Sequence, residues 1–224
     1  MKIKLIIPLV AAVFLITSTG FLPAAENAGG SEPATYEQLK ELAVERNWAD
    51  IVANLNAKDL TAAAGAMGQP ADVLYALRGR ANWALKRGPE AEADYRAAIE
   101  LVPMSAEYWA ALGTNYRDTL KNPSAALEAF KKAIDISLQG GGNRMGYMPV
   151  SVEIDAAGLL CDEGKYDEAL SMLSPYDEAM LARMAPVWKV NVLRALGKNY
   201  LEQGREQEAL DCFQKALETE AVPK

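Results

Sequence analysis

Apolar and polar positions in residues 109–133 follow the period of two α-helices that flank a turn at 121–124. On one face of each segment, apolar residues recur at three- and four-residue steps: Trp109, Leu112 and Tyr116 in the first, and Ala126, Phe130 and Ala133 in the second. That spacing is typical of the buried face of a helix. Gly113 lies inside the first segment, where glycine costs about 1 kcal/mol relative to alanine. We therefore predict a helical hairpin whose small residues let the two helices approach closely.

The same pattern recurs at three other places along the chain, around Gly79, Ala157 and Gly197. Gly79 lies 34 residues before Gly113, and residues 109–116 satisfy W-x2-L-G-x2-Y without a mismatch. This is the first half of the tetratricopeptide repeat (TPR) pattern, whose period is about 34 residues. The chain resembles the TPR family over residues 72–220, and less closely over 35–66. The resemblance implies an all-α fold, a right-handed solenoid of four to five helical hairpins.

Composition and breaker residues predict four parts: a signal peptide at 1–25, a linker at 26–34, a divergent N-terminal helical capping repeat at 35–71, and the TPR domain at 72–224. Terminal repeats of a stack are expected to be atypical. Helices are predicted at about 36–47, 49–55, 59–67, 72–86, 90–101 and 206–219, with a hairpin at 106–137. A glycine-rich loop is predicted at 139–144, and Pro149 is expected to restart a helix that reaches Gly164.

The first 25 residues have the layout of a secretory signal peptide. Lys2 and Lys4 precede an apolar run from Leu5 to Ile16, and small residues follow at 23–25. We expect an exported bacterial protein that is periplasmic or secreted. The alternatives are an uncleaved inner-membrane anchor, which would be the chain's only contact with a membrane, and a cytoplasmic protein.

The composition argues against catalysis and against nucleic-acid binding. The chain has no histidine, which removes the commonest general base and metal ligand. The glycine cluster at 140–142 lacks the lysine and the serine or threonine of a phosphate-binding loop. A net charge of −7 does not suit a polyanion. We expect no enzyme activity, no catalytic residue, no cofactor, no metal and no nucleic-acid partner.

Cys161 and Cys212 are the chain's two cysteines, and each lies on a predicted helix among apolar neighbours. We expect two buried free thiols that act as small hydrophobic residues. Export makes a disulfide between them the alternative.

The resemblance also implies where a partner would bind, because the first helix of each TPR hairpin lines a concave groove. Carried onto this chain, the groove candidates are Arg80, Trp83, Thr114, Arg117, Arg194 and Lys198. Trp83 fits either the groove or the packed core. Four cations in an acidic protein favour a partner with an acidic segment, although they fit ordinary solvated charges as well. The carboxylate clamp of some TPR proteins is not matched, because Ala76 and Ala111 stand where polar groups are needed.

These observations predict a non-catalytic scaffold or adaptor of the bacterial cell envelope that binds a protein or peptide partner in its groove. The alternative is a periplasmic small-ligand-binding or transporter-accessory TPR protein, which would need a closed and largely apolar pocket. A third hypothesis is a structural subunit of an envelope assembly, docked through the apolar loop at 145–148.

Overall fold

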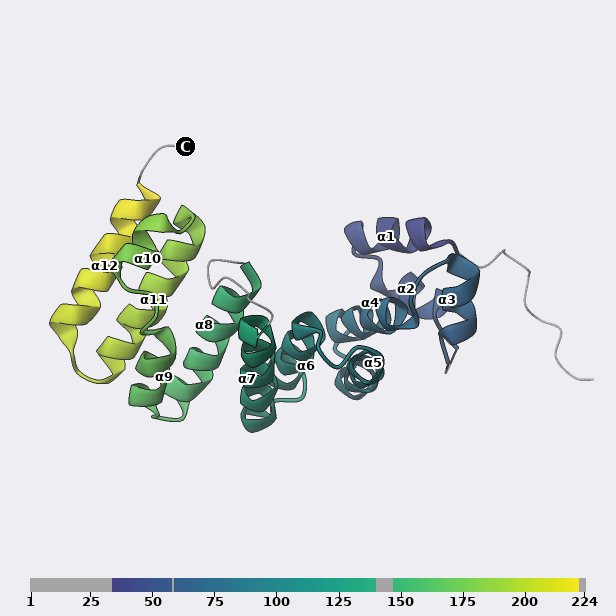
Figure 1. The fold of residues 1–224 in the computed structure, drawn as a ribbon, viewed down its shortest axis with the longest axis horizontal. Helices are drawn as coiled ribbons and strands as arrows, with labels where there is room; N and C mark the ends of the chain where they lie inside the picture. The colour runs from purple at the N-terminus through teal and green to yellow at the C-terminus, as the bar shows by residue number, and fades with distance from the viewer. Residues whose placement is uncertain (1–33, 58, 140–146, 222–224) are drawn as a thin grey trace, which may run out of the picture. The chain divides into compact units, whose positions relative to one another are not determined.

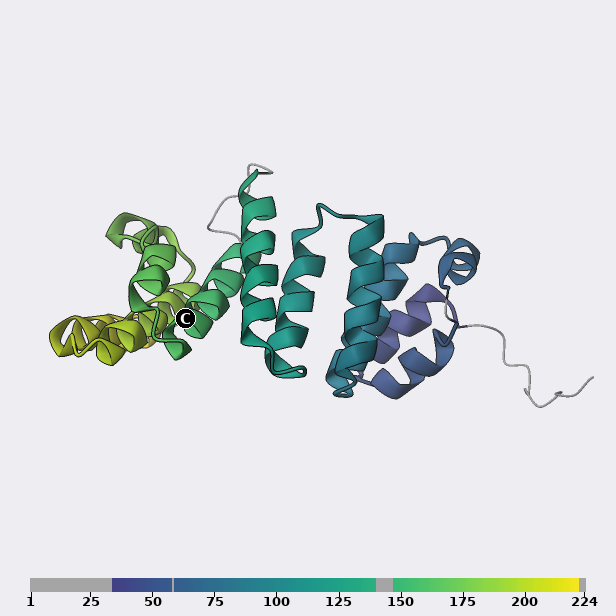
Figure 2. The same ribbon diagram turned by 90° about the horizontal axis from the view of Figure 1, so that it is seen from below.

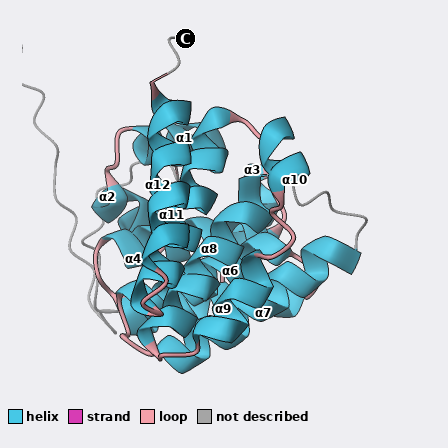
Figure 3. Cartoon of the chain, turned by 90° about the vertical axis from the view of Figure 1, so that its left-hand side faces the viewer, coloured by secondary structure: helices cyan, strands magenta, loops and turns pink. Residues whose placement is uncertain are grey.

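The computed structural model describes residues 34–57, 59–139 and 147–221, and residues 33–224 form one compact unit. Within the described residues the secondary structure is twelve helices and no strand (Figures 1 and 3). The first six are α1 (Tyr36–Val44), α2 (Trp48–Asn54), α3 (Thr61–Met67), α4 (Ala71–Ala84), α5 (Gly88–Leu101) and α6 (Ala106–Asp118). The others are α7 (Pro123–Gln139), α8 (Tyr147–Asp162), α9 (Tyr166–Leu173), α10 (Glu178–Arg183), α11 (Pro186–Glu202) and α12 (Glu206–Glu220).

Consecutive helices pair into hairpins, and the hairpins stack in chain order. The helices of each hairpin pack together: α1 with α2, α4 with α5, α6 with α7, α8 with α9, and α11 with α12. Between hairpins, α5 packs on α6, α7 on α8, and α11 on both α8 and α9. Figure 2 shows the teal helices α6 and α7 side by side. This arrangement confirms the predicted all-α solenoid of helical hairpins.

Three details differ from the sequence prediction. The segment before the last hairpin contains α10, a helix that was not predicted; its N-cap Asp177 accepts a hydrogen bond from the Met180 N–H at 2.8 Å. α8 begins at Tyr147 rather than Pro149, so residues 147–148 of the predicted docking loop are helical. α7 extends to Gln139, where the loop was expected to begin. The predicted signal peptide, all of the linker but Ala34, and residues 140–146 lie outside the described residues.

The close approach predicted around Gly113 is present and recurs in other hairpins. A Cβ atom built on Gly113 would lie 2.6 Å from Cδ1 of Phe130, and one on Gly197 would lie 2.6 Å from Cε1 of Phe213. At Gly79 the distance to the Tyr95 ring is 3.0 Å. In each case the aromatic ring of the second helix lies against the bare backbone of the first. The first two positions exclude a side chain unless the ring moves.

The turn inside four of the hairpins also repeats. One residue adopts a positive φ, and the next N–H donates to the carbonyl five residues earlier, as in a Schellman motif. The positive-φ residues are Arg46, Lys86, Gly164 and Gly204, with φ of 60°, 62°, 74° and 72°. The N–H···O distances are 2.8 Å (Asn47 to Leu42), 2.8 Å (Arg87 to Asn82), 2.8 Å (Lys165 to Leu160) and 2.9 Å (Arg205 to Tyr200). The α1–α2 hairpin therefore turns in the same way as the hairpins with the clearer repeat pattern.

Buried asparagines connect successive hairpins. The Asn115 amide on α6 donates to the carbonyl of Gly88, the first residue of α5, at 2.9 Å. The Asn199 amide on α11 donates in the same way to Tyr166, the first residue of α9, at 3.4 Å. Both asparagines are 0% exposed. Each bond ties the first helix of one hairpin to the start of the preceding hairpin's second helix.

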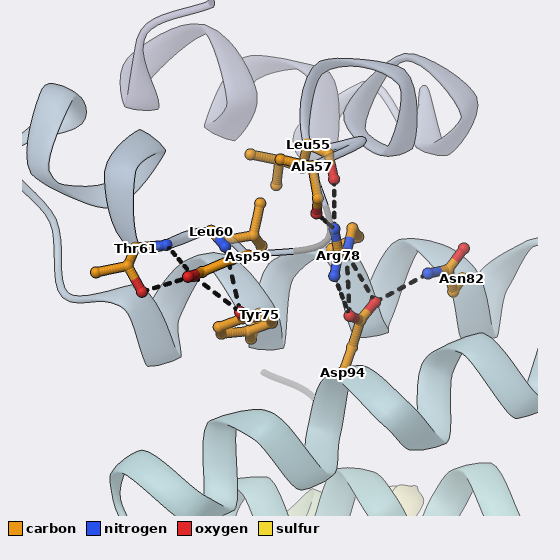
Figure 4. Close-up of polar contacts among 9 residues, drawn as sticks. All are labelled: Leu55, Ala57, Asp59, Leu60, Thr61, Tyr75, Arg78, Asn82 and Asp94. Atoms are coloured by element: carbon orange, nitrogen blue, oxygen red, sulfur yellow. Dashed lines mark hydrogen bonds and ion pairs between the residues drawn. The ribbon is translucent and has the colours of Figure 1, made fainter.

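A buried ion pair joins the N-terminal helices to the rest of the stack (Figure 4). The Arg78 guanidinium on α4 pairs with Asp94 on α5 at 2.6 Å, and the Asn82 amide donates to the same carboxylate at 2.9 Å. Arg78 also donates to the backbone carbonyls of Leu55 and Ala57, which lie between α2 and α3. The Arg78 side chain therefore links its own helix α4 to α5 and to the connection between α2 and α3.

We expect Gly113→Ala to destabilise the protein by up to about 2 kcal/mol. The new methyl group would clash with Phe130, and overpacking of this kind costs about 1–3 kcal/mol, against a gain of about 1 kcal/mol in helix propensity. Gly65→Ala on α3 is the matched control, because nothing lies within 4 Å of its added Cβ. That variant should be more stable than the parent in urea unfolding. If Gly113→Ala were also more stable, the close-approach account would be wrong.

We expect Asp94→Ala to destabilise the protein by about 3–5 kcal/mol, since it leaves a buried guanidinium without its counter-charge. The side chains of Arg78 and Asp94 are 13% and 5% exposed. Glu208→Ala removes the exposed partner of Arg205 and should leave the urea midpoint almost unchanged. Equal effects of the two substitutions on the urea midpoint would contradict a special role for Arg78.

Candidate functional site between α8 and α11

A hollow of about 390 Å³ lies between α8 and α11, two helices that pack against each other. From α8 it is lined by Ser151, Ile154, Asp155, Ala157, Gly158 and Cys161. From α11 it is lined by Trp188, Asn191, Arg194, Ala195 and Lys198. Within each set the residues recur mainly at three- and four-residue steps, so each helix contributes one face.

Small residues form part of the lining of the hollow. Nothing lies within 4 Å of a Cβ atom built on Gly158, in contrast to Gly113 and Gly197. Ala157 and Ala195 add only methyl groups to the lining, and the half-buried Trp188 supplies an aromatic wall. The result is a mainly apolar depression with room for a side chain of a partner.

The cations at the hollow are exposed and paired with exposed acids. Arg194 lies 3.0 Å from Glu220 of α12, and Lys198 lies 3.2 Å from Asp162 of α8. Exposed ion pairs contribute about 0–1 kcal/mol each. A carboxylate of a partner can therefore replace Glu220 or Asp162 at little cost.

Arg117 does not line the hollow itself. It contacts the hollow only through Asp155, with which it forms an ion pair. Its guanidinium lies 2.7 Å from Asp118 and 2.6 Å from Asp155, which lines the hollow. Hydrogen bonds to Asp118, and then to Asp155, raise the pKa of Arg117 above its ordinary value. Both carboxylates belong to the protein, so the role of Arg117 here is to fix Asp155.

The other three predicted site residues do not line the hollow. Arg80 lies over the Trp48 ring of α2, 5.5 Å from its centroid. Trp83 is half-buried against the core, and its Nε1 is buried without a hydrogen-bond partner among the described residues. Thr114 donates its hydroxyl to the Ala110 carbonyl of its own helix at 3.0 Å. Of the six predicted residues, the structure brings only Arg194 and Lys198 together at one hollow.

Trp188 and Asn191 are lining residues that the sequence prediction missed. Both lie on the face of α11 that carries Arg194, at successive three-residue steps toward the start of the helix. Extending that step backward would have found them. The Asn191 carboxamide forms no hydrogen bond with any described residue, so its donor and acceptor are open to a partner.

Both cysteines are free rather than joined in a disulfide; Cys161 is buried as expected, whereas Cys212 is only half-buried. The Cys161 sulfur accepts a hydrogen bond from the Asn199 amide at 2.9 Å, and burial raises the pKa of its thiol. Burial also raises the pKa of Cys212. Cys161 therefore lines the hollow as a neutral, weakly polar group.

Two features are absent from the described part of the chain. None of its helices is both long and apolar enough to cross a bilayer. Its cysteine, aspartate and glutamate side chains form no group of three or more that could hold a metal ion.

Comparison with known proteins agrees with the stacked hairpins. Residues 106–139 and residues 190–220 each match a sequence model of the family described as tetratricopeptide repeat. These matches support a TPR protein. They cover α6 with α7, and most of α11 with α12, which are hairpins with a close glycine–aromatic contact. No curated protein sequence matches the chain.

Solved structures share the TPR-like fold at low sequence identity. BtubC (BKLC) from P. vanneervenii has a TM-score of 0.66 and 19% identity, covering 84% of this chain and 82% of its own. MamA has a TM-score of 0.60 and 18% identity, covering 81% and 94%. YrrB, described as a TPR protein with an unusual peptide-binding site, has a TM-score of 0.59 and 18% identity, covering 82% and 83%. At these identities the comparisons show the fold alone.

Proposed function

We propose that this TPR protein is a non-catalytic interaction scaffold that holds a peptide segment of a partner in the hollow between α8 and α11. TPR-like relatives suggest protein interaction as the general role. The observation that carries the proposal is the hollow itself, where an apolar floor, the Asn191 carboxamide and two exposed cations meet. Among the described residues, the Asn191 carboxamide has no hydrogen-bond partner. The binding of peptides by YrrB gives a precedent within the same fold.

The lining defines the chemistry of the segment. An apolar side chain fits against Gly158, Ala195 and Trp188, and its burial contributes roughly 25 cal/mol per Å² of apolar surface. Asn191 can donate to and accept from the backbone of an extended peptide. Arg194 and Lys198 then favour an acidic residue next to the buried side chain. We infer a segment with one apolar anchor flanked by aspartate or glutamate.

The setting we propose is the bacterial cell envelope. Its support is the basic, apolar and small-residue order of residues 1–25, which suits an export signal. In that setting the protein is periplasmic or secreted, or is held at the inner membrane by an uncleaved signal segment. Its partner would then be another envelope or exported protein.

A small ligand is the second candidate, and the size of the hollow favours it. A volume of about 390 Å³ lies in the range of roughly 300–1,000 Å³ that small-molecule sites occupy. The two candidate ligands differ in whether they need Arg194 and Lys198, the cations at the rim of the hollow. A peptide with an acidic residue needs the cations, whereas an apolar ligand needs only the space.

We expect the double charge reversal Arg194→Glu with Lys198→Glu to weaken binding of an acidic peptide with a central leucine by at least about tenfold, or 1.4 kcal/mol. Reversing the rim charges replaces attraction by repulsion. Fluorescence anisotropy of the labelled peptide measures the affinity. The matched control is Lys131→Glu with Lys132→Glu on α7, which changes the net charge equally and should leave binding unchanged.

Gly158→Leu separates the two candidates. It fills the hollow without a clash at its Cβ, so the fold should be kept while either kind of ligand is excluded. Peptide binding requires that both Gly158→Leu and the charge reversal weaken it. If Gly158→Leu abolishes ligand binding but the charge reversal does not, an apolar small ligand is favoured. If neither variant changes ligand binding, both proposals are contradicted.

A further inference from the structure

α12 exposes two large apolar residues on one face. Leu210 and Leu217 are 57% and 63% exposed. They lie seven residues apart, which places them on the same side of the helix, about 10.5 Å apart along its axis. The face is separate from the hollow, because neither residue lines it.

The same register positions are buried elsewhere in the stack. Residues 126–134 of α7 read ALEAFKKAI, and residues 209–217 of α12 read ALDCFQKAL. Leu127 and Ile134 of α7 correspond to Leu210 and Leu217, and they are only 7% and 8% exposed. Both belong to the main core, and Ile134 lines a surface depression together with Glu153 and Leu160 of α8. In α7, the next helix of the stack covers these positions.

Although helices cover the equivalent positions of α7, no helix in the described part of the chain covers Leu210 and Leu217 of α12. Its partners in the described part of the chain lie on other sides. Ala209 and Ala216 are buried on the side that packs against α11, and Lys215 pairs with Glu178 of α10 at 2.9 Å. A helix laid on Leu210 and Leu217 would repeat the α7–α8 contact.

The negative charge around Leu210 and Leu217 indicates what kind of helix can bind there. α12 carries five acidic residues, Glu206, Glu208, Asp211, Glu218 and Glu220, and one lysine, Lys215. Asp211 and Glu218 directly follow the two leucines, and Glu206 precedes Leu210 by one turn. A second copy of α12 would bring like charges together, and the chain as a whole carries −7. A helix with lysines or arginines beside its apolar ridge complements the face.

We propose that α12 docks an amphipathic helix of a partner protein, with the partner's apolar ridge over Leu210 and Leu217 and its basic residues beside Asp211 and Glu218. Helix-in-groove recognition of this kind uses anchors at i, i+3, i+4 and i+7. The proposal does not depend on the hollow between α8 and α11, and it adds a second interaction surface at another place in the stack.

The test uses the full chain and a synthetic helical peptide with leucines at i, i+3, i+4 and i+7 and lysines on both flanks. We expect Leu210→Ser with Leu217→Ser to weaken binding of this peptide by at least about tenfold. The matched control is Leu101→Ser on α5, a leucine that is 54% exposed and should leave the affinity unchanged. Glutamates in place of the lysines should also abolish binding.

Several results would overturn the proposal. One is equal peptide affinity in the parent and the Leu210→Ser, Leu217→Ser variant when both melt alike. Another is equal binding of the glutamate peptide. If the parent protein self-associates in sedimentation and the Leu210→Ser, Leu217→Ser variant does not, the face binds a second copy of the chain. If the α12 amides are protected from exchange in the peptide-free chain and lose that protection when residues 5–16 are deleted, the face binds the chain's own apolar segment.

Discussion

The stack depends on the contact between a bare glycine backbone and an aromatic ring in its hairpins. At Gly113 and Gly197 the ring of Phe130 or Phe213 lies where a Cβ would be, so the two helices lie closer than side chains on both would allow. Between hairpins, the carbonyls of Gly88 and Tyr166 accept hydrogen bonds from the buried Asn115 and Asn199 amides of the following hairpin. The close contacts within hairpins and the buried amide bonds between hairpins together hold the stack.

The α8–α9 hairpin departs from this rule, and the hollow lies along its first helix. Ala157 of α8 stands at the position equivalent to Gly113, while Gly158 beside it faces open space. α9 has only eight residues, against seventeen in α7, and α11 packs on both α8 and α9. Small residues on the open side of α8 leave room that a side chain of a partner can fill.

Much of the fold could be predicted from the sequence, and much of the site could not. The three- and four-residue steps around Trp109 and Phe130 encode packing, so the helices and hairpins followed from them. α10 was missed because a six-residue helix carries too short a pattern. For the site, the structure places Arg194 and Lys198, two of the six predicted residues, at a hollow. Sequence could not show that Asp118 and Asp155 engage Arg117, because those contacts depend on the register between separate helices.

The central claim is that the hollow between α8 and α11 receives a peptide segment. The most direct measurement is amide chemical-shift mapping of the isotope-labelled protein during titration with an acidic peptide that has a central leucine. The account predicts saturable shifts at residues 151–161 of α8 and 188–198 of α11, with the Asn191 side-chain amide among them. Shifts confined to α4 and α6, around Arg80 and Thr114, or an absence of saturable shifts, would contradict it.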